Sequence, residues 1–268
     1  MKTNPELTFL KLGGSLITNK SQPLTARQGI IQHIADEISF CCSKDPELRL
    51  LIGHGSGSFG HVIASQYQTQ NGVQKTGDWL GFAEVWAAAR ELNQIVINTL
   101  SAAGLPVMAF PPSAGAITAN KILKSWDIQP LKFALTHHLI PIVQGDVIFD
   151  TVLGGTIFST EQVFQHLAQE LYPSRILLAG ADPGVYRAPG KTEDIIDLIT
   201  PANFGKILPA LSGAKTPDVT GGMLVKVELM LSLVKENPRL KVQIFSGVEP
   251  GNIRMVLAGE KIGTLITA

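Results

Sequence analysis

The stretch Leu7-Thr8-Phe9-Leu10-Lys11-Leu12-Gly13-Gly14-Ser15 decides the fold of this chain. Residues 7–12 form a nearly continuous apolar run, which is typical of a strand covered on both faces in a parallel sheet. The paired glycines that follow allow backbone N–H groups to converge on an anion. Ligands bind open α/β sheets at the carboxyl ends of the strands, so this position favours an anion site beside Lys11. Taken alone, the motif is equally typical of a tight turn with a surface lysine.

Similar apolar runs recur along the chain and alternate with longer amphipathic segments. Two short runs on either side of Leu153-Gly154-Gly155 predict a hairpin between residues 147 and 158. The alternation predicts an α/β fold, an open αβα sandwich with a mainly parallel central sheet. We expect further strands at residues 50–53, 106–110, 139–143, 175–179, 241–245 and 263–267.

Start and stop residues mark the predicted helices. Thr25-Ala26-Arg27-Gln28 is a capping-box pattern before one amphipathic segment, and Ser159-Thr160-Glu161-Gln162 opens another. Asp78 precedes a long helix that Gly104 stops. Thr200-Pro201 places a cap and a first-turn proline before a further helix.

The composition excludes several classes of protein. The chain has 268 residues, 45% of them hydrophobic, which suffices for one large α/β domain or two small ones. Lys+Arg and Asp+Glu are both 22 and aromatic residues are 6%, which argues against nucleic-acid binding. The uncharged stretch 92–120 is interrupted by glycine and prolines, so it indicates a buried helix, a turn and a buried strand rather than a membrane span. Adjacent Cys41 and Cys42 offer no disulfide framework, and no signal-peptide pattern is seen, so we expect a cytoplasmic protein.

A second glycine-rich loop follows the second predicted strand, Gly53-His54-Gly55-Ser56-Gly57-Ser58-Phe59-Gly60-His61. It lacks the Walker A pattern. Residues 55–60 fit the dinucleotide fingerprint formally, but no acidic residue ends a strand about 20 residues later. His61 is expected near a helix start, where free N–H groups and an imidazole can bind phosphate together. Two such loops at neighbouring strand ends predict two facing phosphate sites, the geometry of a phosphoryl transfer.

Three later segments complete the candidate site. Asp218-Val219-Thr220-Gly221-Gly222-Met223, with Lys226 one turn further, suits the β- and γ-phosphates of a nucleotide. Residues 180–186, which include Asp182 and Tyr186, follow a predicted strand and could surround the ribose or the base. Asp146 offers a carboxylate at the same sheet edge. The sequence leaves open whether Tyr186 only packs and whether Asp146 only caps a turn.

Phosphoryl transfer needs cations and N–H donors around the transferred group more than it needs covalent chemistry. Lys11, Lys20 and Lys226 form a plausible set for that task together with the glycine loops. A dedicated pair of metal-binding carboxylates is not evident, so we assign no metal ligands. Any Mg²⁺ is then expected to be held mainly by the nucleotide phosphates.

These motifs, in this order, resemble the amino acid kinase superfamily and, within it, the isopentenyl phosphate kinase family. The resemblance runs from residue 8 to 267. It implies a homodimer, and ATP-dependent phosphorylation of a small phosphate monoester, isopentenyl phosphate, with Mg²⁺ as the accompanying ion. Under it, residues 1–268 form a single kinase domain, in which about 1–172 bind the acceptor and about 173–268 bind the nucleotide.

The resemblance also implies residue roles. Lys20 would stabilise the transition state, with Lys11, His61 and Lys226 as the other catalytic residues. The ATP-binding residues would be Lys11, Gly13, Gly14, Ser15, Gly57, Asp182, Tyr186, Gly222 and Lys226. The acceptor-binding residues would be Ser56, Gly60, His61, Asp146 and Thr160.

Two segments depart from the family pattern. Ser159-Thr160-Glu161 replaces Ser-Gly-Asp, and residues 180–186 replace Thr-Asp-Val-Asp-Gly-Val-Tyr. These departures leave a divergent acceptor open, with a fosfomycin kinase-like enzyme or another small phosphate or phosphonate kinase as the nearest alternative. A non-catalytic nucleotide sensor is the alternative of another class. An apolar pocket for the organic tail is expected near Phe82, Val85, Trp86 and Ile148, residues that could equally be core.

Overall fold

A computed structural model describes residues 6–187, 194–212 and 222–268 of the chain. Within them, the central sheet has eight strands in the order β10-β12-β11-β9-β1-β2-β6-β3. All neighbouring pairs are parallel except β11 with β12. The expected open αβα sandwich with a mainly parallel sheet is therefore confirmed. The strands are β1 Leu7–Leu12, β2 Arg49–His54, β3 Val107–Ala109, β6 Ile140–Gln144, β9 Arg175–Gly180, β10 Leu198–Ile199, β11 Lys241–Ser246 and β12 Thr264–Ile266.

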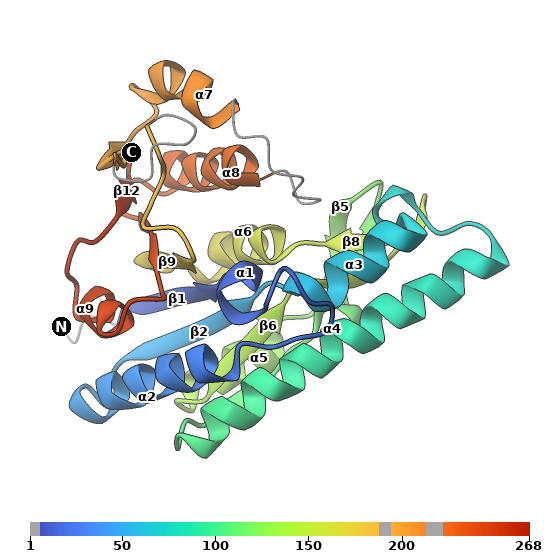
Figure 1. Ribbon diagram of the computed structural model, residues 1–268, viewed down its shortest axis with the longest axis horizontal. Helices are drawn as coiled ribbons and strands as arrows, with labels where there is room; N and C mark the ends of the chain where they lie inside the picture. Colours follow the sequence, from blue (N-terminus) through green and yellow to red (C-terminus); the bar gives the residue numbers. More distant parts are fainter. Residues whose placement is uncertain (1–5, 188–193, 213–221) are drawn as a thin grey trace.

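Helices cover both faces of this sheet because the central strands are apolar on both sides. On one face, Phe9 and its neighbours pack on α5 (Gln129–Thr136), α6 (Thr160–Leu171) and α8 (Gly222–Glu236). On the other face, Leu10 and Leu12 pack on α2 (Gln28–Lys44), α4 (Thr76–Ala102) and α9 (Asn252–Leu257). In Figure 1, α2 and α4 lie at the bottom, and α8 with α7 (Phe204–Ser212) lies at the top.

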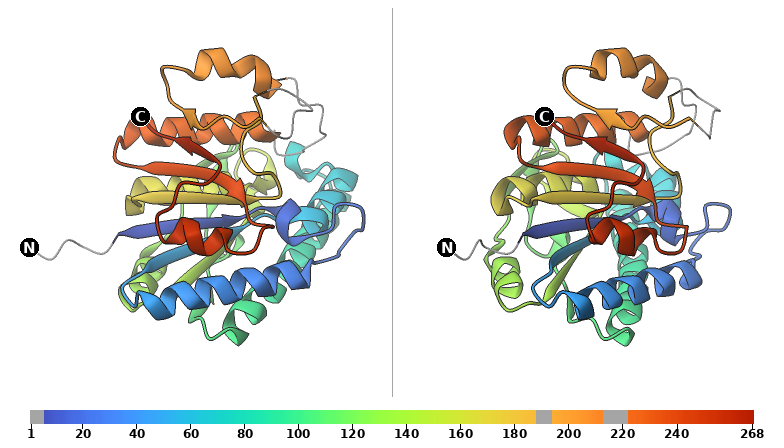
Figure 2. Two further views of the ribbon diagram at one scale, coloured as in Figure 1. Left: turned by 60° about the vertical axis from the view of Figure 1, so that its left-hand side comes forward. Right: turned by 90° about the vertical axis from the view of Figure 1, so that its left-hand side faces the viewer.

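A smaller mixed sheet stands beside the main sheet. It contains β4 (Ile117–Ala119), β5 (Ile122–Ser125), β7 (Asp146–Asp150) and β8 (Gly154–Phe158), in the order β5-β4-β7-β8. In it, β4 and β7 are the parallel pair. The predicted hairpin is confirmed as β7 and β8, whereas β4 and β5 were not expected. Figure 2 shows the strands of the main sheet side by side, with α9 and α2 on the same side of them.

Three local predictions were wrong. The Thr25 hydroxyl bonds the Pro23 carbonyl instead of capping α2. The Thr200 hydroxyl accepts the Asn203 N–H as a cap would, but it closes a turn, and α7 begins only at Phe204. Strand β3 lies at the sheet edge and is not buried, since Met108 is 50% exposed.

Other helix signals were confirmed. Ser159 and Gln162 form the expected capping box at the start of α6. Gly104 follows α4 with φ +84°, a left-handed conformation that ends the helix. Among the described residues, no helix is both long enough and apolar enough to cross a membrane.

Candidate functional site

The site lies where parallel strands β9, β1, β2 and β6 end side by side. Their register places Leu12 opposite both His54 and Ala179, and His54 opposite Gln144. Each strand is followed at once by a loop with glycine, as the sequence predicted. The loops therefore come together at one edge of the sheet.

The first glycine loop (residues 13–15) and the second glycine loop (residues 55–60) are in direct contact. A Cβ atom added to Gly14 would lie 2.6 Å from the Gly57 nitrogen, and one added to Gly55 would lie 2.9 Å from the Gly14 nitrogen. The first loop is also tied to β9, because the Gly13 N–H donates to the Ala179 carbonyl at 2.8 Å. The expected facing of the two loops is thus seen in the backbone itself.

Both loops border one cavity of about 530 Å³. The start of α3 (Gly57–Tyr67), of α6 and of α8 reaches the cavity through Gly57, Thr160 and Gly222. Helix N-termini carry unpaired N–H groups and partial positive charge, which favour bound phosphate. The remaining predicted site residues on its wall are Lys11, Gly13, Gly14, Ser15, Lys20, Ser56, Gly60, His61, Asp146, Asp182 and Lys226.

Tyr186 is the exception among the predicted residues. It does not line the cavity, but its hydroxyl donates to the Asp182 carboxylate at 3.1 Å, and Asp182 does line it. Of the predicted nucleotide loop 218–223, residues 218–221 lie outside the described part of the chain. Of the described residues of that segment, Gly222 and Met223 both border the cavity.

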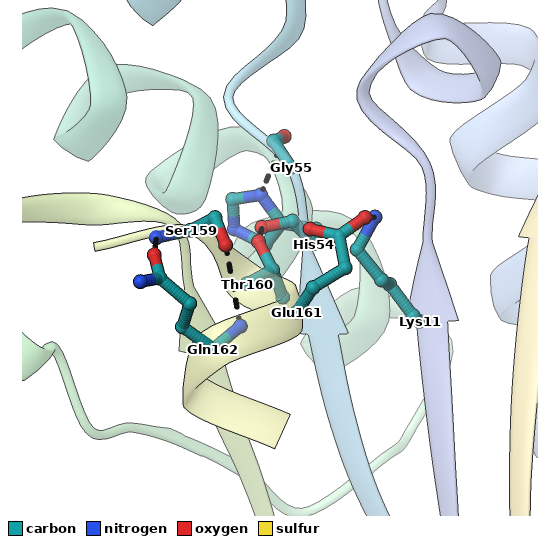
Figure 3. Close-up of polar contacts among 7 residues, drawn as sticks. All are labelled: Lys11, His54, Gly55, Ser159, Thr160, Glu161 and Gln162. Carbon is teal, nitrogen blue, oxygen red and sulfur yellow. Dashed lines mark hydrogen bonds and ion pairs between the residues drawn. The ribbon is translucent and has the colours of Figure 1, made fainter. Parts of the chain in front are cut away.

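Lys11 is paired with a residue that the sequence presented only as a departure from the family pattern. Its Nζ lies 2.9 Å from Oε1 of Glu161, and the two side chains are only 7% and 15% exposed. Figure 3 shows the Glu161 side chain reaching from the first turn of α6 to the Lys11 amine on β1. Burial alone would raise the pKa of Glu161, but the nearby Lys11 and Lys226 cations outweigh it and lower that pKa. Glu161 therefore holds both lysines by charge.

Because of this ion pair, the unfolding free energy of the protein should decrease at acidic pH. Because the folded-state pKa of Glu161 lies below its ordinary 4.5, its contribution is complete above that pH and is lost as the pH falls toward the folded-state pKa. We expect Glu161→Gln to weaken the dependence of the unfolding free energy on pH in this acidic range. We also expect it to lower the unfolding free energy by about 1–3 kcal/mol at pH 7. Urea unfolding at several pH values measures it. Glu170→Gln, at an exposed carboxylate, is the matched control and should leave the pH dependence of the unfolding free energy unchanged.

His54 and Thr160 connect the second glycine loop to its neighbours. His54 is fully buried, with Nε2 2.9 Å from Asn93 Oδ1 and Nδ1 3.2 Å from the Gly55 carbonyl. Burial lowers the pKa of His54 more than these hydrogen bonds raise it, so the neutral ring is favoured. The Thr160 hydroxyl donates to the His54 carbonyl at 2.7 Å, so its proton is used to fix the backbone.

Asp146 is a buried carboxylate at the cavity wall. It accepts the N–H groups of Ser113 at 3.3 Å and of Val147 at 2.9 Å. Burial raises its pKa, and these hydrogen bonds partly offset that rise. It therefore does cap a turn, in addition to facing the cavity.

The apolar part of the cavity wall differs from the sequence prediction. Val85 lines the cavity as expected, together with Ala89 and Ile157. Phe82 packs behind them in a buried cluster with Val85, and Ile148 belongs to the main core. Trp86 does not line the cavity; it is 40% exposed. The core alternative is thus confirmed for Phe82 and Ile148, because apolar patterning alone does not distinguish a cavity wall from the core.

The contact between the two loops leaves no room for a side chain at Gly57. This residue has φ +48°, and an added Cβ would lie 2.1 Å from Thr18 Oγ1 and 2.7 Å from the Gly14 carbonyl oxygen. We expect Gly57→Ala to lower the free energy of unfolding by about 1–3 kcal/mol. Denaturant unfolding measures it. Gly77→Ala in α4, where an added Cβ meets nothing within 4 Å, is the control and should not destabilise the fold; equal stability of Gly57→Ala would contradict the packing described.

Comparison with known proteins supports this picture. Residues 6–246 match the amino acid kinase family. The chain is 32% identical over 266 residues to isopentenyl phosphate kinase of Methanocaldococcus jannaschii, covering 97% of this chain and 98% of that one. It is 33% identical over 273 residues to the enzyme of the same name from Methanothermobacter thermautotrophicus, covering 97% and 99%. A solved structure of an isopentenyl phosphate kinase superposes with a TM-score of 0.82 at 29% identity, covering 97% of this chain and 100% of that one.

Proposed function

This chain belongs to the amino acid kinase family and is a kinase, and on that premise we propose that it phosphorylates isopentenyl phosphate to isopentenyl diphosphate with ATP as the donor. The names of its relatives suggest the acceptor. The observation that carries the proposal is the contact between the two glycine loops at the wall of one cavity that Lys11, His61 and Lys226 also line. Such a cavity suits two phosphate groups brought end to end.

The nucleotide occupies the side of the cavity bordered by the first glycine loop and α8. Gly14 and Ser15 present backbone N–H groups to the β- and γ-phosphates. Gly13 lines the same side of the cavity, and its own N–H is bonded to the Ala179 carbonyl. Lys11 and Lys226 neutralise those phosphates, and Glu161 orients both amines between turnovers. Gly222 begins α8 at this side of the cavity, and Asp182, held by Tyr186, lies toward the ribose or base.

The acceptor occupies the side bordered by the second glycine loop. Ser56, Gly60 and His61 hold its phosphate at the start of α3, and Gly57 lies beside the transferred group. Thr160 offers its backbone at the start of α6, and Asp146 limits the space for the acceptor. The short hydrocarbon tail then packs on Val85, Ala89 and Ile157.

In the reaction, a phosphate oxygen of the acceptor attacks the γ-phosphorus, and the bond to the bridging oxygen of ADP breaks. A phosphate monoester has its second pKa near about 6, so the attacking oxygen is ionised at neutral pH and needs no general base. The charge that develops on the equatorial oxygens is stabilised by Lys11, Lys226 and Lys20, the last at the exposed mouth of the cavity. The chain therefore acts by positioning and electrostatics.

Mg²⁺ is proposed as the ion that accompanies ATP, and it would supply further charge neutralisation on the phosphates. In the parts of the chain that the structure describes, no three His, Cys, Asp or Glu side chains form a metal-binding group. The lysines that line the cavity fit a site in which the nucleotide carries the ion. We also propose a homodimer, and a cytoplasmic location that agrees with two free cysteines.

The division of labour between the two halves of the chain is part of the proposal. Residues 1–268 act as one kinase domain, with the acceptor held by about 1–172 and the nucleotide mostly by about 173–268. The first glycine loop crosses this division, because it belongs to the N-terminal half and faces the nucleotide.

The proposal is tested by a coupled assay of ADP release with a panel of acceptors. We expect release that depends on isopentenyl phosphate, with mass-spectrometric detection of isopentenyl diphosphate. Fosfomycin, other phosphate monoesters and free amino acids serve as alternative acceptors in parallel. Release that depends only on one of those acceptors, or nucleotide binding without release for any acceptor, would contradict the proposal.

A further inference from the structure

A single hydroxyl group lies between the two glycine loops. Thr18 follows α1 (Gly14–Ile17) and is 1% exposed. Its Oγ1 donates to the Gly14 carbonyl at 2.7 Å and accepts the Ser58 N–H at 3.0 Å. The Gly14 carbonyl belongs to the first glycine loop. The Ser58 N–H belongs to the second glycine loop, where that loop forms the first turn of α3.

The two hydrogen bonds are complementary. A hydroxyl bonded to the carbonyl four residues earlier is common in helices, and here it fixes the direction of the hydroxyl hydrogen. The lone pairs of Oγ1 are thereby left for the Ser58 N–H. Both distances lie in the normal range for strong hydrogen bonds. The Gly14 carbonyl also accepts the Thr18 N–H at 2.9 Å, so the link to Ser58 is the one that depends wholly on the side chain.

Packing supports the same link. Gly57, next to Ser58, is pressed against Thr18, since an added Cβ would lie 2.1 Å from Oγ1 and 2.8 Å from Cγ2. Thr18 also pairs with Ala26 as an isolated bridge, which closes the loop that carries Lys20. Thr18 therefore contacts the first and second loops through its side chain and the base of the Lys20 loop through its backbone.

We propose that Thr18 is a positioning residue that fixes the separation and alignment of the donor and acceptor phosphates. The inference rests on the proposed function, because it needs a phosphate in each loop. Each loop can bind its own phosphate without Thr18. Only the transfer requires the two phosphates to be held in line, and a misplacement of about 1 Å between reacting groups can cost about 100-fold in rate.

The test compares Thr18→Val, which has nearly the same shape but no hydroxyl, with Thr18→Ser, which keeps the hydroxyl. We expect Thr18→Val to lower kcat by about 10- to 100-fold with each KM changed less than about threefold. Thr18→Ser should stay within about threefold of the wild type in kcat. A Thr18→Val enzyme with normal kcat, or one that loses activity only through KM, would overturn the proposal.

A binding measurement separates positioning from a general loss of structure. A bisubstrate analogue that joins adenosine to an isopentenyl group through a polyphosphate bridge gains affinity only when both loops are correctly spaced. We expect Thr18→Val to lose at least about tenfold in affinity for this analogue, while its calorimetric affinities for ATP and for isopentenyl phosphate stay within about threefold. Equal losses for all three ligands would contradict the proposal.

Thr118→Val is the matched control for the loss of a buried threonine hydroxyl. Thr118 is fully buried, its hydroxyl donates to Asp150 at 2.8 Å in the small sheet, and it does not line the cavity. It should lower Tm while leaving kcat near the wild-type value. If Thr18→Val fails to fold, Thr18→Ala replaces it in each measurement; failure of both to fold would assign Thr18 to the core and overturn the inference.

The failure of this inference can be told from the failure of the proposed function. A wild-type enzyme that does not act on isopentenyl phosphate contradicts the proposed function before any variant is made. An active wild type whose Thr18→Val variant keeps kcat contradicts only the role of Thr18.

Discussion

Replacing Lys11 by methionine is expected to lower kcat by two to three orders of magnitude while the protein remains folded. The Lys11 amine is nearly buried at the end of β1, where charge interactions are stronger than in water. It lies beside the loop proposed for the transferred phosphoryl group. Removal of one preorganised donor at a developing charge costs about 10²- to 10³-fold in other enzymes. Steady-state kinetics with saturating ATP and acceptor measure the loss.

A double variant separates catalysis from stability in this prediction. Lys11→Met leaves Lys226 as the cation that balances Glu161 among the described residues, so part of the damage is a poorly paired buried carboxylate. The double variant Lys11→Met/Glu161→Gln should be more stable than Lys11→Met alone, but its kcat should remain as low. Lys11→Arg keeps the charge but changes its shape and should fall between the wild type and Lys11→Met. A folded Lys11→Met enzyme with kcat within tenfold of the wild type would remove Lys11 from the mechanism.

The second large effect is expected at His61. His61 borders the cavity from the second turn of α3, near Ser56 and Gly60. A charge-assisted hydrogen bond from its ring to the acceptor phosphate would be lost in His61→Ala. We expect kcat/KM for the acceptor to fall about 30- to 1000-fold, which corresponds to about 2–4 kcal/mol. The KM for ATP should change little, because the nucleotide binds on the other side of the cavity.

His137→Gln provides the control for His61. His137 is exposed at the end of α5, and its Nδ1 meets the Phe133 carbonyl at 2.8 Å. Its replacement should alter neither kinetic constant. Near-normal turnover of His61→Ala and of His61→Gln with isopentenyl phosphate would exclude His61 from acceptor recognition.

Much of the fold was predictable because its signals are local. Strand β1 ends at Leu12, as the apolar run and the following glycines predicted. The Ser159 cap and the Gly104 stop also depend only on neighbouring residues. The order of glycine loops after successive strands was enough to bring the loops to one sheet edge, because parallel strands share that edge.

The placement of β4 and β5 beside the predicted β7–β8 hairpin was not predictable, because it is organised by one buried side chain. The Asp150 carboxylate accepts the Thr118 hydroxyl and the backbone N–H groups of Asn120, Lys121, Val152 and Leu153. These hydrogen bonds lower its pKa although burial would raise it. The short strands β4 and β5 have little hydrophobic periodicity of their own. The sequence therefore contained no indication that the Asp150 carboxylate would hold them together.

Two features of the site were also beyond the sequence. Glu161 differs from the acid of the family pattern by one methylene, and only the structure shows it reaching Lys11. Thr18 reads as an ordinary polar residue after a short helix, and its link to Ser58 joins residues 40 positions apart. Long-range pairings of this kind leave no local signal in a single sequence.

The central claim is that the two adjoining loops allow direct transfer from ATP to the acceptor in a single in-line step. The most direct measurement is the stereochemical outcome with ATP made chiral by oxygen isotopes at the γ-phosphorus. One in-line displacement inverts the configuration at phosphorus, and that is the result we predict. Net retention would require two displacements through a phosphorylated enzyme and would contradict direct transfer between the loops.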